Sequence, residues 1–427
     1  MLTESSGKIT TSKALSSHLE SKHLIVPTQY YDPETFQVNH LVSLFLSKGW
    51  RVTVIAPFPS YPSASALRGC ERPVFTHVRL KICRFPTVKR DGSIFSAGLN
   101  SICFVALGSL LTIFYALRHP KAHFFAVQYS PFTCIIPAWV AASLLNRSAS
   151  LWIFDLWPQS IFAFFGHTRF TKFFYSLIEA FALLVYSKFS SFFVSSPSFV
   201  SLPPVNRFKG ARLLYSWEPN DIVPRLGSAK VDLLRPIRVV SIGNLGTAHD
   251  LDLLEEFLLF TRSLNFTWSF VGGGSGMARL SSFCGSHKLS NVTFHGFLPK
   301  AECLTLCSHA DLSIVPFRDS EISDTICYRF VSSLSVGTPV ISFGVNAVSR
   351  LVLSSRCGFV LGQVDKSALQ VSSFSLSSGS LSSLARSISS EISSIRTSFR
   401  ESAFALFRAC FSESAAEFSL RSFFPTA

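Results

Sequence analysis

The chain has 427 residues, of which 48% are hydrophobic and only 15% are charged, whereas soluble domains average about 25% charged residues. A chain this apolar can bury enough surface to fold, so the composition excludes an intrinsically disordered protein and a charged repeat array. The length predicts two domains of roughly 150 to 220 residues each. The net charge of +14 predicts an acidic partner: nucleic acid, an anionic membrane surface or a phosphorylated small molecule.

Residues 1–22 are polar and have no apolar signal segment, so we expect a disordered N-terminal extension or, in a eukaryotic source, an organellar transit peptide. From residue 23 an apolar strand, a helix and a second strand follow within 35 residues. Such a βαβ unit predicts a parallel sheet. The alternation continues, so residues 23–220 are predicted as a first α/β domain and residues 221–236, which contain prolines, as a linker.

The alternation of strands and helices restarts after the linker. Residues 237–371 are predicted as a second α/β domain, and residues 372–427 as C-terminal amphipathic helices, because Leu, Ile and Phe recur there at helical spacing. Two doubly wound domains in tandem predict a ligand cleft between the carboxyl ends of their sheets.

A long apolar helix is expected near residues 98–118, and its strongest segment, 102–117, has 16 residues. Because about 18 to 20 residues are needed to span a bilayer, we interpret it as a buried core helix. Insertion into the membrane interface is the alternative, and spanning is the least favoured. The ten cysteines include no CxxC motif, so we expect neither zinc nor disulfides.

Two glycine-rich turns follow predicted strands of the second domain. Gly243 and Gly246 lie in SIGNLGTAHD, and Gly272 and Gly274 lie in FVGGGSG. Backbone N–H groups in such turns, and at the start of the following helix, can bind phosphate. Neither turn has the GxGxxG pattern or a Walker lysine, so a nicotinamide cofactor and P-loop hydrolysis are not favoured. Taken alone, each turn is better explained as a simple tight connection, but two such turns at adjacent strand ends strengthen the phosphate-binding interpretation.

Three other positions can carry chemistry. Arg329 lies about one helical turn into a segment that ends at Gly337, where its guanidinium could bind a diphosphate or simply be solvated. Asp155 follows a central strand, where it could orient a sugar hydroxyl or cap the next helix. Trp152 and Trp157 flank this acid and could stack on a sugar or belong to the core.

In their order and spacing, these blocks resemble the retaining nucleotide-sugar glycosyltransferases of family 4. The closest resemblance is to the bacterial subgroup of colanic-acid and O-antigen transferases of the N-acetylfucosaminyl type. The blocks are TQYYDPETFQVNHL, KGWRVTVIAPFPSYP, DLWPQSI, SWEPND, VVSIGNLGTAHDLD, FVGGGSG, VTFHGFLP, ADLSIVPF and YRFVSSLSVGTPVIS, and they cover roughly residues 23–345. The resemblance implies the α/β GT-B fold, with two Rossmann-like doubly wound parallel-sheet domains facing across a cleft.

The resemblance also implies a UDP- or GDP-sugar held mainly by the second domain, an acceptor held by the first, and no metal or other cofactor. Arg329 and Asp155 would be the catalytic residues. The nucleotide-sugar would contact Gly243, Asn244, Gly246, His249, Gly272, Gly274, Gly296, Phe297, Leu298, Thr325 and Ser332, with the main chain of 296–298 meeting the base. The acceptor side would be lined by Pro33, Glu34, Thr35, Tyr61 and Trp157.

One position departs from the family pattern. The family usually has a Glu that bonds the ribose where this chain has Ser332. A serine hydroxyl is shorter and neutral, so we expect ribose binding to be weaker or rearranged. Glu321 and Asp324 are the nearby acids that could substitute.

The prediction is therefore retaining, metal-independent sugar transfer from a UDP- or GDP-sugar to a lipid-linked or polysaccharide acceptor in cell-surface glycan synthesis. The enzyme would associate peripherally with the cytoplasmic face of the plasma membrane, where anionic lipids attract its basic residues. The alternatives are a catalytically degenerate partner subunit of a polysaccharide assembly complex, and a nucleotide-sugar 2-epimerase or phosphorylase. Nucleic-acid binding is not expected, because the basic residues are scattered.

Overall fold

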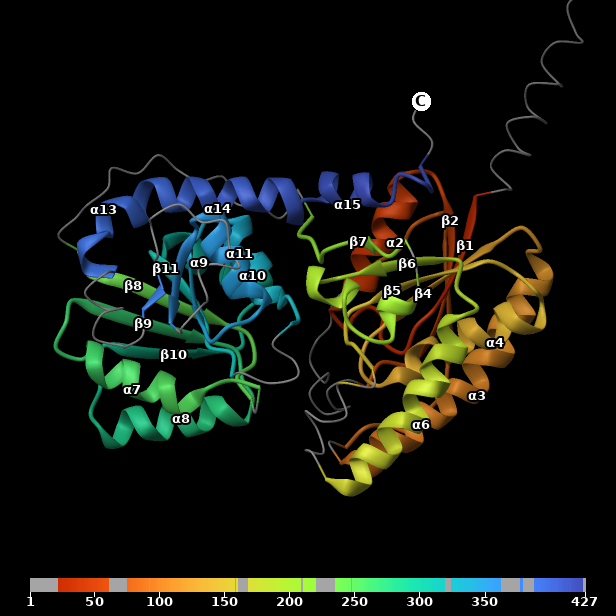
Figure 1. Ribbon diagram of the computed structural model, residues 1–427, viewed down its shortest axis with the longest axis horizontal. Coiled ribbons are helices and arrows are strands. Elements are labelled where there is room, and N and C mark those ends of the chain that lie inside the picture. Colours follow the sequence, from red (N-terminus) through yellow and green to blue (C-terminus); the bar gives the residue numbers. More distant parts are fainter. Residues whose placement is uncertain are drawn as a thin grey trace, which may run out of the picture. The chain divides into compact units, whose positions relative to one another are not determined.

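The computed structural model of the protein describes residues 22–60, 75–91, 93–157, 159, 168–208, 210–219, 235–246, 248–318, 324–361, 377–378 and 388–424. The chain forms two compact units. The first comprises Met1–Ser195, Phe199–Leu214 and Arg421–Ala427, and the second comprises Ser196–Ser198 and Tyr215–Leu420. Each unit is built on its own parallel sheet (Figure 1).

The first unit contains a seven-stranded parallel sheet in the order β3-β2-β1-β4-β5-β6-β7. Its inner strands are continuous apolar runs, as expected for a sheet covered on both faces. The strand order reverses between β1 and β4, which is the switch point where doubly wound sheets bind ligands. The strands are β1 His23–Pro27, β2 Arg51–Pro57, β3 Leu80–Phe85, β4 His123–Gln128, β5 Ala149–Ile153, β6 Ser191–Val194 and β7 Arg212–Leu213.

The helices of the first unit include one that is longer than the sequence pattern predicted. The helices are α2 Gln37–Ser47, α3 Ile94–Arg118, α4 Ile136–Leu144 and α6 Arg169–Tyr186. Helix α3 has 25 residues and begins before the expected position. The prediction that this segment is too short to span a bilayer is therefore wrong, because the 24 residues Phe95–Arg118 are long and apolar enough by length and composition.

The second unit contains a seven-stranded parallel sheet in the order β10-β9-β8-β11-β12-β13-β14, with its switch point between β8 and β11. The strands are β8 Ile237–Ile242, β9 Phe266–Val271, β10 Val292–Gly296, β11 Leu312–Val315, β12 Val340–Phe343, β13 Gly358–Leu361 and β14 Ser377–Ser378. The helices between these strands include α7 Leu251–Thr261, α8 Ser275–Ser286, α9 Lys300–His309, α10 Tyr328–Ser335 and α11 Ala347–Ser355.

The C-terminal segment packs on both units in turn. Helices α13 Ile392–Ser394, α14 Arg400–Leu406 and α15 Glu413–Ser419 belong to the second unit. There the buried Asp311 pairs with Arg396 at 2.9 Å and with Arg235 at 2.7 Å. The last residues belong to the first unit, where the Phe423 ring lies 5.5 Å from the ring of Phe45 and 5.9 Å from that of Phe125. The sequence pattern contained no sign of this return.

Candidate functional site

Three loops meet at the carboxyl ends of β10, β9 and β8. Because the strands are parallel neighbours, the loops that follow them lie at the same edge of the sheet. The N–H of Leu245 donates to the carbonyl of Gly273 at 2.9 Å, and the N–H of Gly272 donates to the carbonyl of Gly296 at 2.7 Å. The two glycine turns singled out in the sequence therefore interlock through their main chains. The loops are 243–246, 272–274 and 296–298.

Two of these glycines are required by the close approach of the turns. Gly274 has φ +97° and ψ 166°, and a Cβ there would lie 2.2 Å from the carbonyl oxygen of Leu245. Gly272 has φ +119°, and a Cβ there would lie 2.5 Å from the carbonyl oxygen of Gly243. Only glycine adopts this backbone region readily, so the spacing of the glycines in FVGGGSG follows from the packing of the two turns.

Gly274→Ala should lower the free energy of unfolding by at least about 2 kcal/mol, because the alanine is strained both in its backbone and against Leu245. The matched control is Gly246→Ala in the neighbouring turn, where a Cβ would meet nothing within 4 Å. Urea unfolding of the two variants measures the difference. Equal stability of the two variants would contradict the interlocked turns.

Arg329 lies in the first turn of α10 and reaches into the same place. Its Nη2 donates to the carbonyl of Asn244 at 2.7 Å, and its Nη1 lies 3.4 Å from Oγ of Ser241. Burial lowers the pKa of the Arg329 guanidinium from its ordinary value, but a guanidinium keeps its proton at neutral pH. Among the described residues, Arg329 forms no ion pair with a carboxylate. The structure thus holds a cation beside the glycine turns.

His249 belongs to the same cluster as a neutral ring. Its Nδ1 lies 3.1 Å from the main-chain N–H of Gly246, which donates to it, and the ring stacks on Phe317 with centroids 5.5 Å apart. Burial, and secondarily the charge of Arg329, lower the pKa of His249 to about 4. The same Nδ1 lies 3.3 Å from the carbonyl of Gly246, to which it donates in the other tautomer. Nε2 makes neither of these contacts, and it can donate to a phosphate in the tautomer in which it carries the proton.

The loop 296–298 presents a side chain as well as its main chain. Gly296 has φ +66°, and the side chain of Phe297 is 80% exposed. Phe297 also lies close to Gly273, where a Cβ would come within 2.7 Å of the ring. An exposed aromatic ring beside the turns offers a flat apolar surface, which the sequence alone did not indicate. Leu298 follows in this loop, and Thr325 lies half-buried three residues before α10.

Ser332 is placed against a carboxylate from a distant segment. Its Oγ donates to Oε1 of Glu218 at 2.8 Å, and Nζ of Lys300 lies 2.6 Å from Oε2 of the same carboxylate. Glu218 is fully buried, and Lys300 also donates to the hydroxyl of Tyr328 at 2.7 Å. A carboxylate therefore touches the position where the family usually has Glu, but the linker-side block SWEPND supplies it.

The acids expected from the sequence to replace the missing Glu were Glu321 and Asp324, both close to Ser332. Asp324 instead pairs with Arg350 at 3.2 Å, and Glu321 lies outside the described residues. The available signal was an acid between Trp217 and Pro219 in a block that matched the family. Nothing in the sequence showed that this acid would meet a residue 114 positions later.

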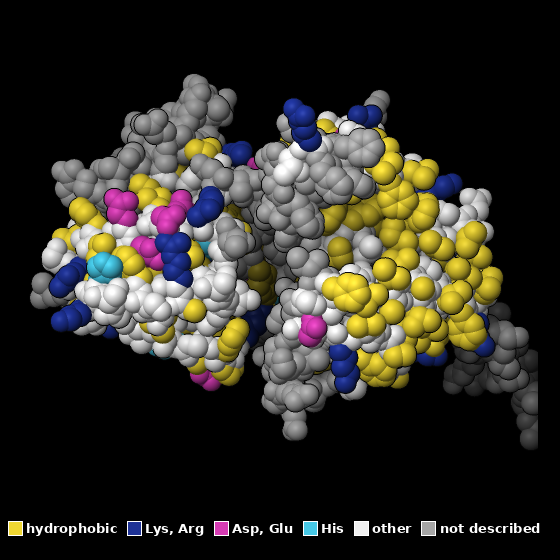
Figure 2. All heavy atoms as spheres, turned by 90° about the horizontal axis from the view of Figure 1, so that it is seen from below, with side chains coloured by type: hydrophobic (Ala, Val, Ile, Leu, Met, Phe, Trp, Pro, Cys, Tyr) yellow, Lys and Arg dark blue, Asp and Glu magenta, His cyan; other side chains and the backbone are white. Residues whose placement is uncertain are grey.

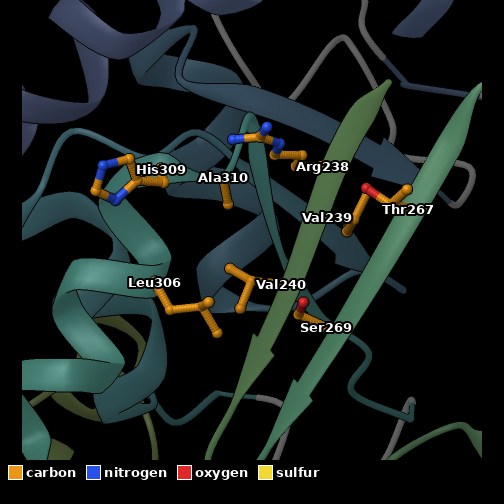
Figure 3. A pocket seen from close by; sticks show the side chains of 8 residues that line it. All are labelled: Arg238, Val239, Val240, Thr267, Ser269, Leu306, His309 and Ala310. Atoms are coloured by element: carbon orange, nitrogen blue, oxygen red, sulfur yellow. The ribbon is translucent and has the colours of Figure 1, made fainter. Parts of the chain in front are cut away.

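A pocket of about 250 Å³ lies apart from these loops (Figure 3). It involves the second residues of β8 and β9, Arg238 and Thr267, and the last turn of α9. These positions lie toward the strand beginnings, opposite the edge that carries the glycine turns. The pocket is therefore separate from the predicted nucleotide-sugar site. Its lining residues are Arg238, Val239, Val240, Thr267, Ser269, Leu306, His309 and Ala310.

In the first unit, Asp155 and Trp157 converge on the loop after β4. Oδ2 of Asp155 accepts the main-chain N–H of Ser130 at 2.8 Å, and the indole N–H of Trp157 donates to Oγ of Ser130 at 3.2 Å. Burial raises the pKa of Asp155, and its hydrogen bonds from Ser130 act in the opposite direction. The half-buried carboxylate thus braces a loop. The alternative prediction, that Asp155 caps a helix after Pro158, concerns residues 160–167, which lie outside the described residues.

Glu34 also has a bracing role. It is buried, its Oε1 accepts the main-chain N–H of Ser60 at 2.9 Å, and its Oε2 accepts that of Tyr31 at 3.2 Å. It therefore ties the loops after β1 and β2 together. Pro33 is half-buried and Thr35 is exposed beside it.

Trp152 and Tyr61 were the other two aromatic residues predicted to contact a sugar or the acceptor. Trp152 is fully buried, and its indole N–H donates to the carbonyl of Leu214 at 2.8 Å, so it belongs to the core. Tyr61 lies outside the described residues.

The second unit matches a known protein family. No curated protein sequence matches the chain significantly. Residues 236–373 match the protein family described as "Glycosyl transferases group 1". The second unit carries a glycosyltransferase group 1 domain. This match covers the glycine turns, Arg329 and Ser332.

Solved structures extend the likeness to both units. Sucrose-phosphate synthase from Thermosynechococcus elongatus superposes with a TM-score of 0.66 at 13% identity, covering 94% of this chain and 98% of that one. Anabaena HepE in complex with UDP gives 0.62 at 14% identity, with the same coverage of both chains. WaaG, a glycosyltransferase involved in lipopolysaccharide biosynthesis, gives 0.55 at 12% identity, again with 94% and 98% covered.

These likenesses confirm the predicted GT-B fold with its two parallel-sheet units. The group 1 domain of residues 236–373 supports glycosyl transfer as the activity of the chain. Membership of family 4 and of the N-acetylfucosaminyl subgroup stays a prediction.

Proposed function

We propose that this glycosyltransferase moves a sugar from a UDP- or GDP-sugar to a lipid-linked or polysaccharide acceptor, with retention of configuration and without a metal ion. The observation that carries the proposal is Arg329. Its guanidinium lies against the turn at Asn244 and has no carboxylate partner among the described residues. A fixed cation beside main-chain turns at a helix start suits a diphosphate.

The Arg329 guanidinium and the main-chain N–H groups of the turns contribute most when the bond between the anomeric carbon and the diphosphate oxygen breaks. Negative charge then grows on the leaving diphosphate, and a prearranged guanidinium and N–H donors stabilise it. The acceptor hydroxyl attacks on the same face and passes its proton to the leaving phosphate, so the reaction needs no protein base. Glu34 suits this scheme, because main-chain N–H groups donate to both of its carboxylate oxygens, whereas Asp155 accepts one such bond, at Oδ2.

The nature of the donor and of the pathway draws support from the similar structures. Anabaena HepE was solved with UDP and with UDP-glucose, which favours a UDP-sugar among the possible donors. WaaG takes part in lipopolysaccharide biosynthesis, which agrees with an acceptor in cell-surface glycan synthesis. We further propose that the enzyme works at the cytoplasmic face of the plasma membrane, where a lipid-linked acceptor would be presented.

A panel of nucleotide-sugars tests the donor. A donor that binds only the folded protein should raise its stability by about 2.7 kcal/mol at a concentration one hundred times its dissociation constant, and the melting temperature should rise accordingly. We expect this rise with a UDP- or GDP-sugar and not with the free sugar. If no nucleotide-sugar shifts the melting temperature, the donor assignment fails. Analysis of the anomeric configuration of the product then decides whether the transfer is retaining.

A catalytically silent partner subunit is the second candidate. It is favoured by the burial of Glu218, whose carboxylate is occupied by Ser332 and Lys300. The two candidates differ in turnover. A silent subunit binds the donor without transferring or hydrolysing it, whereas the enzyme releases nucleoside diphosphate when an acceptor is supplied.

A further inference from the structure

Helix α3 has large apolar side chains on its outer side. Every residue between 95 and 117 that is exposed is apolar, and none has a side chain that can form a hydrogen bond. Phe95 is 75% exposed, and Ile102, Leu110 and Leu117 are 65–66% exposed. These positions lie about one or two helical turns apart, so they form a stripe along one side of the helix.

The apolar surface continues over two further helices. Leu144 at the end of α4 is 69% exposed, and Leu177 and Leu184 on α6 are 60% and 55% exposed. Helix α4 packs on α3, and the Phe181 ring of α6 lies 5.9 Å from the ring of Trp139 on α4. We call the outer sides of α3, α4 and α6 the apolar face, and Figure 2 shows the apolar side chains gathered over this part of the first unit. Soluble monomers rarely expose so much contiguous apolar surface without a binding function.

The inner side of α3 decides how this surface can meet a membrane. Phe104, Thr112 and Ala116 are fully buried, and the helix packs on β1, β2 and α4. A spanning helix would have to leave these contacts and expose the sheet. Helix α3 therefore stays in the unit and offers only its outer side, which is the geometry of a helix lying in the plane of the membrane interface.

Most of the described charges at the ends of these helices are cationic. Arg118 ends α3 and Lys121 follows it, while Arg169 begins α6 and Lys188 follows it, and all four side chains are exposed. Among the described side chains of the three helices the one acid is Glu179, which is half-buried, and Asp91 is an exposed acid three residues before α3. This pattern complements an anionic lipid surface. A protein partner fits less well, since protein interfaces carry about one hydrogen bond per 100–200 Å², which the outer stripe of α3 cannot supply.

We propose that the apolar face docks the enzyme on an anionic bilayer. Its leucine and phenylalanine side chains insert at the level of the headgroups, and the cations at the helix ends contact lipid phosphates. The proposal identifies the apolar face as the surface by which the enzyme would contact the membrane in the localisation proposed above. Membrane docking does not depend on sugar transfer. The docking proposal can therefore fail while the donor assignment holds, and the donor assignment can fail while the docking proposal holds.

Co-sedimentation of the full chain with vesicles tests the docking. The wild type should bind vesicles of phosphatidylcholine mixed with phosphatidylglycerol. The double variant Leu110→Gln/Leu117→Gln should bind them at least about tenfold more weakly, because two exposed leucines no longer insert. The matched control is Leu259→Gln/Leu264→Gln, which changes two leucines of the second unit that are 37% and 39% exposed and should leave binding unchanged.

A second variant tests the charge. Arg118→Gln/Lys121→Gln should lose the preference for vesicles with phosphatidylglycerol over vesicles of phosphatidylcholine alone. Unchanged melting temperatures show that the variants are folded. Absence of vesicle binding by the wild type, or equal binding by the leucine variant, overturns the proposal. A lipid-free dimer that the leucine variant abolishes also overturns it, because the face would then join two copies of the chain.

Discussion

Arg329→Ala should lower the rate of sugar transfer at least about hundredfold, because a prearranged group that stabilises developing charge is typically worth this much. The loss should lie mainly in kcat, since the charge on the diphosphate grows as the glycosidic bond breaks. Steady-state kinetics with the donor found in the thermal panel measure it. The fold should persist, because among the described residues the Arg329 side chain donates only to Asn244 and Ser241, at the edge of the unit.

Two further variants sharpen the test of Arg329. Arg329→Lys keeps the charge but loses the fork that can reach the turn and a phosphate together, so its rate should fall between those of the wild type and alanine. Arg318→Ala removes a half-exposed arginine of the same unit that pairs with Asp252 at 3.7 Å, and it should leave the rate unchanged. If Arg329→Ala turns over as fast as the wild type, Arg329 does not stabilise the leaving diphosphate and the proposed function loses its main support.

Ser332→Glu should destabilise the second unit by about 3 kcal/mol or more, because it places a second carboxylate against the buried Glu218. Ser332→Gln is the matched control, since it has the same size without the charge. Combining Ser332→Glu with Glu218→Gln moves the carboxylate to α10, where Lys300 can still pair with it. The combination should regain most of the lost stability. Urea unfolding of the wild type, Ser332→Glu, Ser332→Gln and the double variant measures this.

The coupling energy between Ser332→Glu and Glu218→Gln tests whether Ser332, Glu218 and Lys300 act together. Glu218→Gln alone should also be destabilising, because Lys300 loses its partner. The double variant should therefore be more stable than the sum of the single changes by at least about 2 kcal/mol. Additive effects would show that Glu218 and Ser332 act independently. Donor affinity of the double variant then reports whether a carboxylate on α10 improves ribose binding.

Much of the fold followed from local pattern. Strands such as β1 and β12 are continuous apolar runs, and the helices between them have helical spacing, so the parallel sheets were predictable. The two glycine turns were predictable for the same reason, because they lie where a strand ends and a helix begins. Helix α3 shows the limit, since its start at Ile94 depends on a cap formed by Ser93, which hydropathy alone does not mark.

The candidate site divides along similar lines. Arg329 and the turns were named from the sequence because they are local features of one family block each. Glu218 was not, because its contact with Ser332 joins segments far apart in the chain. Asp155 and Glu34 were named as cleft residues, but only their hydrogen bonds to Ser130 and Ser60 show that they brace loops.

The sequence by itself determined an apolar, basic chain with two parallel α/β units and a diphosphate-binding set of turns, because apolar periodicity and glycine placement are written locally. Only the tertiary structure decided which apolar side chains are core. Along α3, Phe104 faces the sheet while Leu110 faces outward, although hydropathy treats the two alike. The same holds for the net charge of +14, because the positions of its cations around the apolar face depend on how the helices pack.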